Sequence, residues 1–171
     1  MTSNSTDLVH SLSFWWRVSR YDPALRDERG AHQVETWTSV ADVGNRYDGH
    51  ELILAEYERV ESAYLAAFVA FANETGVEHF QVRDLERGDG LDEGAILTLH
   101  AATGVVGRML REDVICKLEA PSDRFALHVG FDLYMYVGSS DWCPDAMRQA
   151  RELGLYVEPD WPSPQLLEGD K

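Results

Sequence analysis

The sequence predicts a single α+β domain, with one mixed or largely antiparallel sheet, a long helix packed on one face of the sheet, and a short C-terminal helix. Three observations predict this fold class. A helical pattern covers residues 54–75, short segments of alternating hydrophobicity lie on both sides of it, and a length of 171 residues suits one domain. No linker divides the chain, so we expect one domain over 1–171, with flexible polar tails at 1–8 and 162–171.

The first elements are a strand and a helix. Residues 12–20 alternate between two faces, which predicts a strand. Ser39 and Asp42 have the spacing of a capping box, which predicts one short helical turn. In residues 54–75 large apolar side chains recur every three or four positions, which predicts an α-helix that stops at Gly76. This apolar stripe consists of Tyr57, Val60, Tyr64, Phe68 and Phe71.

Strands dominate the rest of the chain. Residues 125–137 alternate throughout, which indicates either a tight hairpin turning near 130–132 or one long bent strand. Residues 103–110 are ambiguous, because two glycines weaken the case for a short helix. The remaining predicted elements are strands at 77–85, 95–99, 114–118 and 155–158 and a helix at 144–153 that has proline at its first turn.

Charge and cysteine content restrict the function. The net charge of −15, which is most concentrated in residues 51–100, argues against nonspecific binding to nucleic acid or anionic membrane and permits a basic partner. Cys116 and Cys143 are too few for a disulfide scaffold or a zinc ribbon. Residues 1–7 lack the pattern of a signal peptide, and no apolar run is long enough to span a membrane. We therefore expect a cytoplasmic protein.

Known catalytic signatures are absent from the sequence. It contains no G-x-S-x-G, Walker loop, G-x-G-x-x-G or H-E-x-x-H motif. The six histidines are scattered, and no two have the spacing of ligands on one helix, so we expect neither a metal nor a cofactor.

Three polar groups are candidate binding sites. Arg17 and Arg20 begin a segment dense in arginine and carboxylate, which could hold an anion or form an ion-paired loop. Glu61 and Glu58 on the predicted helix could hold a cation, act as acid and base, or lie on a solvated face. The third group lies on one side of the alternating run and suits acid–base chemistry, recognition or a structural network. It consists of His128, Asp132, Tyr134 and Tyr136.

Several segments together resemble a group of uncharacterised bacterial proteins, some of which look like immunity proteins of toxin systems. The resemblance covers residues 14–158 and supplies no catalytic residues. It implies that the protein binds and blocks a toxin. The segments that carry the resemblance are Trp16–Pro23, Trp37–Ser39, Glu56-Tyr57 with Glu61, Leu110–Glu112 and Phe131–Val137.

Three functions follow as hypotheses. The leading one is an acidic binding protein, an immunity-type inhibitor that docks on a basic protein such as a toxin, rather than an enzyme. The second is a small hydrolase or transferase that uses His128, Asp132 and the tyrosines. The third is a ligand-sensing or structural domain. A deep pocket at His128 would favour the enzyme, a flat or convex face would favour the inhibitor, and nothing in the sequence points to an oligomeric state.

Overall fold

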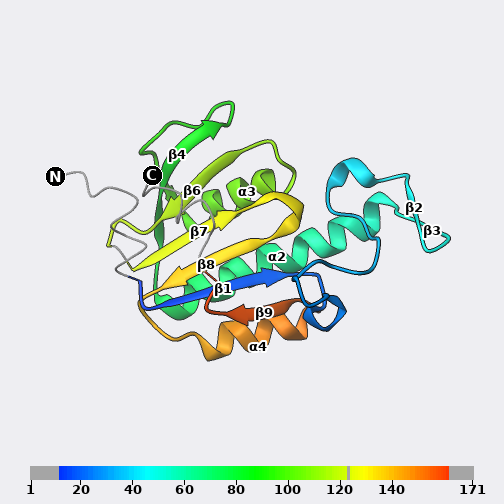
Figure 1. Cartoon of the computed structure of the whole chain (residues 1–171). Coiled ribbons are helices and arrows are strands. Elements are labelled where there is room, and N and C mark those ends of the chain that lie inside the picture. The colour runs from blue at the N-terminus through cyan, green and yellow to red at the C-terminus, as the bar shows by residue number, and fades with distance from the viewer. Residues whose placement is uncertain (1–11, 123, 162–171) are drawn as a thin grey trace.

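Seven antiparallel strands form one sheet in the order β5-β4-β6-β7-β8-β1-β9 (Figure 1). The computed structural model describes residues 12–122 and 124–161, so the tails predicted at 1–8 and 162–171 lie outside the described residues. The strands are β1 (Phe14–Ser19), β4 (His79–Arg87), β5 (Ile96–Thr98), β6 (Ile115–Glu119), β7 (Phe125–Val129), β8 (Met135–Ser139) and β9 (Tyr156–Pro159). A separate small hairpin is formed by β2 (Arg46–Tyr47) and β3 (His50–Glu51).

Helices cover one face of the sheet, which confirms the predicted fold class. In Figure 1, α2 (Leu54–Thr75) and α3 (Leu99–Leu110) lie behind the strands, and α4 (Pro144–Glu152) lies beside β9. Both shorter helices contact α2. In the described part of the chain, no helix is long and apolar enough to cross a membrane.

The stripe of α2 forms the centre of the core. Tyr64, Phe68 and Phe71 are fully buried, with Trp16 of β1 5.1 Å from Phe71 and Phe80 of β4 5.3 Å from Phe68 between ring centroids. Burying each such side chain stabilises the fold by about 1.5–3 kcal/mol. The predicted stripe therefore holds the two halves of the sheet against one helix.

Two ambiguities of the sequence are resolved in the structure. Residues 125–137 form a hairpin whose turn contains a 3₁₀ segment, Phe131–Leu133, with positive φ at Asp132 (61°) and Leu133 (60°). The segment 103–110 belongs to α3, which starts earlier than its pattern suggested, at Leu99. The hydroxyl of Thr98 accepts a hydrogen bond from the Ala101 N–H and caps this helix.

A side chain near the C-terminus of α2 caps the N-terminus of α4. Gly76 ends α2 in a left-handed conformation (φ 69°), which glycine adopts without steric cost. Glu74 in the last turn accepts hydrogen bonds from the N–H groups of Asp145 and Ala146 at 3.2 and 2.6 Å. Because the side chain of Cys143, at the N-cap position of α4, accepts no capping hydrogen bond, Glu74 satisfies these first donors instead.

Candidate functional site

A row of polar side chains crosses the helix-free face of the sheet. Residues that pair directly across strands share a face, so the register of the sheet fixes which side chains meet. The row comprises the successive cross-strand partners Arg83, Lys117, His128, Tyr136, Arg17 and Glu158, on β4, β6, β7, β8, β1 and β9.

His128 and Tyr136 occupy the middle of this row. Their rings stack with centroids 6.2 Å apart, and the two residues are only 3% and 6% exposed. Burial, together with the positive charge of Lys117, lowers the pKa of His128 to about 4. At neutral pH the imidazole is therefore uncharged and a weak base.

A small apolar cluster adjoins the row. Trp15 and Leu12 pack with Ala126 and Tyr136 on the helix-free face. Trp15 lies against Gly138, where an added Cβ would come within 2.7 Å of the Trp15 ring. The side chains of Leu12 and Trp15 therefore cover part of this sheet face.

Arginines and aromatic rings alternate along one side of the row. The Arg17 guanidinium lies 4.8 Å from the Tyr134 ring centroid and 3.8 Å from that of Trp161. Each such contact contributes about 0.5–2 kcal/mol. The full series of neighbours is Trp37, Arg20, Tyr21, Tyr134, Arg17 and Trp161.

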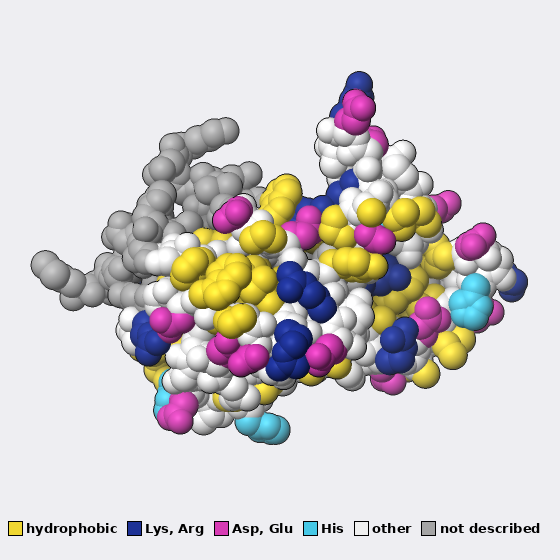
Figure 2. Space-filling view, turned by 90° about the horizontal axis from the view of Figure 1, so that it is seen from below, with side chains coloured by type: hydrophobic (Ala, Val, Ile, Leu, Met, Phe, Trp, Pro, Cys, Tyr) yellow, Lys and Arg dark blue, Asp and Glu magenta, His cyan; other side chains and the backbone are white. Residues whose placement is uncertain are grey.

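Glu158 ends the row between two arginines. Its carboxylate accepts hydrogen bonds from Arg17 and from Arg26. Burial alone would raise the pKa of Glu158, but the hydrogen bonds from Arg26 and Arg17 outweigh it and hold the pKa below its usual value. Figure 2, seen from the α4 and β9 side, shows acidic and basic side chains intermixed along this edge. Two arginines of the arginine-rich segment, Arg17 and Arg26, are therefore ion-paired with the same carboxylate.

Most residues of the predicted sites gather on or beside this face. Arg17, Arg20 and Tyr134 belong to the alternating series, while His128 and Tyr136 stack beside it. Asp132 lies at the exposed tip of the β7–β8 turn, where its backbone carbonyl accepts a hydrogen bond from the Tyr21 hydroxyl at 2.7 Å. Burial raises the pKa of Tyr21 to about 12, so this phenol stays protonated and donates.

Glu61, on α2, does not lie on this face of the sheet. Its carboxylate accepts hydrogen bonds from Arg111, just after α3, at 2.7 and 2.9 Å, and Arg111 also lies 3.8 Å from Glu58. The two glutamates predicted as a pair on the helix thus share one arginine from another element. This arrangement joins α2 to the end of α3.

Both cysteines of the chain lie in buried positions. Burial raises the pKa of the Cys116 and Cys143 thiols to about 12 and 11, which leaves little reactive thiolate at neutral pH. No group of three or more histidine, cysteine or carboxylate side chains that could hold a metal ion occurs among residues 12–122 and 124–161.

Two acidic loops meet at the end of the sheet where β4 stops. The β4–β5 loop and the α3–β6 turn are joined by hydrogen bonds from Arg108 to the carbonyl of Asp89 (2.9 Å) and from Arg87 to the carbonyl of Glu112 (3.3 Å). Apart from Asp84 and Glu93, which are ion-paired with Lys117 and Arg83, the exposed acids at this end of the sheet form no ion pair with any described residue. They are Glu86, Asp89, Asp92, Glu112 and Asp113, which we call the acidic end.

Several residues of the row and of the acidic end were not among the predicted site residues. Lys117 and Glu158 join the row only through the strand register. The acidic end combines residues about twenty positions apart, and the charge excess over 51–100 was the only sequence signal for it. That signal also included Glu78, which precedes β4 and thus lies at the opposite end of the strand.

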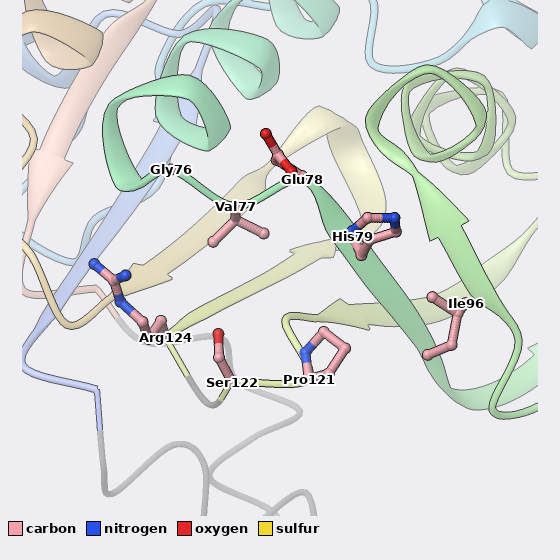
Figure 3. A pocket seen from close by; sticks show the side chains of 8 residues that line it. All are labelled: Gly76, Val77, Glu78, His79, Ile96, Pro121, Ser122 and Arg124. Atoms are coloured by element: carbon pink, nitrogen blue, oxygen red, sulfur yellow. The ribbon is translucent and has the colours of Figure 1, made fainter.

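The polar groups around one wide hollow do not converge on a reactive centre. It has a volume of about 530 Å³ and lies at the start of β4, beside Glu78, His79 and Arg124 (Figure 3). In Figure 3, His79 and Arg124 lie on opposite sides of the hollow, and Arg124 is ion-paired with Asp141. A ligand site normally brings a few polar groups to one centre, which this hollow does not.

Comparison with known proteins did not assign the chain to a family. No protein-family model matches the chain, and searches of curated proteins and of solved structures found no significant similarity.

Proposed function

We propose that this protein is an acidic, cytoplasmic binding protein that docks on a basic protein partner, as an immunity-type inhibitor docks on a toxin. The observation that carries the proposal is the acidic end, whose five exposed carboxylates form no ion pair with a described residue and outnumber Arg87 and Arg108, the two arginines that donate hydrogen bonds to its backbone. Such a surface attracts a positively charged partner over long distances and raises the association rate.

The state of the other polar groups supports binding over catalysis. The buried His128 has a pKa of about 4, and the thiols of Cys116 and Cys143 are protonated. Arg17 and Arg26 are both ion-paired with Glu158 inside the fold. A hydrolase or transferase needs a base or nucleophile poised near neutral pH, whereas an inhibitor needs only an accessible complementary surface.

Capture from an extract of the protein's own host tests the proposal. The immobilised protein is exposed to the extract at about 0.05 M salt, and the retained protein is identified by mass spectrometry, purified and measured in binding kinetics. We expect a basic protein whose association rate falls at least about tenfold between 0.05 and 0.5 M salt, because salt screens electrostatic attraction.

Two results would contradict the proposal. One is a retained partner that is acidic, or whose association rate does not depend on salt. The other is turnover of a panel of carboxylic and phosphate esters that is lost in His128→Phe while the variant remains folded, which would favour the hydrolase instead.

A further inference from the structure

An apolar hollow of about 220 Å³ opens beside the acidic end. It lies between the α3–β6 turn and the β7–β8 turn, and its apolar walls come from Met109, Val114, Ile115, Val129 and Phe131. Small-molecule sites commonly have volumes of about 300–1,000 Å³. This hollow is therefore sized for a single side chain rather than a whole metabolite.

The fold itself creates this hollow. Pairing between β6 and β7 ends at Lys117 and His128, and the hollow lies beyond that pair. Gly130 is one of the residues that line it. The left-handed backbone at Asp132 and Leu133 accompanies a turn in which Leu133 is buried at 4% exposure and Phe131 is left 69% exposed.

One carboxylate lines the hollow, and others are close to it in the chain. Glu112 lines the hollow, and three further acids are chain neighbours of lining residues, since Asp113 precedes Val114, Glu86 precedes Arg87, and Asp132 follows Phe131. Arg87, the one cation among the lining residues, donates a hydrogen bond to the carbonyl of Glu112. An apolar centre with an acidic rim is complementary to an apolar side chain flanked by lysine or arginine.

We infer that this hollow is the anchor point at which the protein grips its partner, and that the partner is a protein segment with one large apolar side chain between basic residues. The inference rests on the proposed function and adds the place and the chemistry of contact. Binding energy in protein interfaces is concentrated in a few apolar anchors that fill pockets, while rim charges set the association rate and specificity. Phe131 then packs beside the inserted side chain and the acidic rim contacts the flanking cations.

Two synthetic peptides test the inference against the full chain. The first has the sequence Lys-Arg-Leu-Arg-Lys, and the second replaces its leucine by glycine, so both carry the same charges. Binding is followed by amide chemical shifts in nuclear magnetic resonance. We expect the leucine peptide to bind at least about fivefold more tightly, with the largest shifts at Val114, Ile115 and Phe131.

Matched variants separate the contribution of the apolar anchor to binding from the contribution of the acidic side chains. Phe131→Ala should weaken the leucine peptide at least about fivefold, whereas Ile96→Ala, which removes another exposed apolar side chain (53% exposed) beside the hollow at the start of β4, should change binding less than twofold. Asp113→Lys should weaken both peptides at least about fivefold. Glu78→Lys makes the same charge change at the far end of β4, about 30 Å away for a strand of nine residues, and should have less than half that effect.

Each other outcome overturns the inference in a recognisable way. If the two peptides bind equally and Phe131→Ala has no effect, the hollow is not an anchor. If both peptides nevertheless bind in a salt-dependent way, the proposed function still stands. Equal effects of Asp113→Lys and Glu78→Lys mean that net charge acts without a localised site. If neither peptide shifts any amide, the acidic end does not take basic segments, and the capture experiment then decides the proposed function by itself.

Discussion

Glu158 on the edge strand β9 lies directly opposite Arg17 on β1, and Arg17 donates two hydrogen bonds to its carboxylate, at 3.1 and 3.3 Å. Arg26, from the loop after β1, donates two more at 2.6 and 3.0 Å. All three side chains are at most 15% exposed. One carboxylate therefore compensates two guanidinium groups and fastens both the edge strand and the loop to the centre of the sheet.

Replacing Glu158 by glutamine should destabilise the fold by about 3 kcal/mol, near the lower end of the cost of breaking a buried ion pair, because two guanidinium groups lose their counter-charge. The free energy of unfolding in urea measures this loss. Asp141→Asn is the matched control, since its ion pair with Arg124 is half exposed and should contribute less than about 1 kcal/mol. Equal losses in the two variants would mean that the Glu158 cluster is solvated.

Gly138 should not tolerate a side chain. The Cβ of Gly138→Ala would lie 2.7 Å from Trp15 Cζ2 and 2.8 Å from Leu12 Cδ1, so we expect a loss of about 1–3 kcal/mol from overpacking. Gly104→Ala makes the same change inside α3 with nothing within 4 Å, and should stabilise the protein by about 0.5–1 kcal/mol. Opposite shifts in melting temperature are expected, and a neutral Gly138→Ala would show that Trp15 moves freely.

Phe68 should be among the most stabilising side chains of the long helix. It is fully buried between Phe80 and Phe125, so Phe68→Ala should cost about 3–5 kcal/mol in chemical denaturation. Phe131→Ala removes the same atoms from a 69% exposed position and should change stability by less than about 0.5 kcal/mol. A loss below about 1 kcal/mol for Phe68→Ala would contradict the burial of this face of α2.

His128 should make stability fall as the pH drops from about 6.5 towards 4. Burial, with the repulsion of Lys117, keeps its folded pKa near 4 against 6.5 in the unfolded chain. Between these values the unfolded state binds a proton that the folded state does not, so acidification favours unfolding, and the loss from pH 7 to pH 5 should be about 2 kcal/mol.

A variant isolates this contribution. His128→Phe removes the titrating group and keeps an aromatic ring that can stack on Tyr136, so the difference in unfolding free energy between variant and parent should shift by about 2 kcal/mol in favour of the variant from pH 7 to pH 5. Urea titrations at pH 5, 6 and 7 give this difference. A constant difference would mean that His128 titrates normally in the folded protein.

The sequence by itself determined the local elements. The helix Leu54–Thr75 has the bounds predicted from its apolar period and its terminal glycine, and the capping box at Ser39 forms as expected. Such features depend on interactions between residues three or four positions apart, so a short stretch of sequence is enough to predict them. The antiparallel hairpin was one of two alternatives for 125–137, because alternation continues through a turn as well as along a strand.

Only the tertiary structure decided which of these elements meet. Arg17 and Glu158 are far apart in the chain, and a strand register, which shifts every side chain to the other face when it slips by one residue, brings them together. The same holds for Glu112 and Phe131, which come to one hollow because the pairing of β6 and β7 ends before it. Side-chain periodicity fixes the face of an element, whereas burial of the whole core fixes its neighbours.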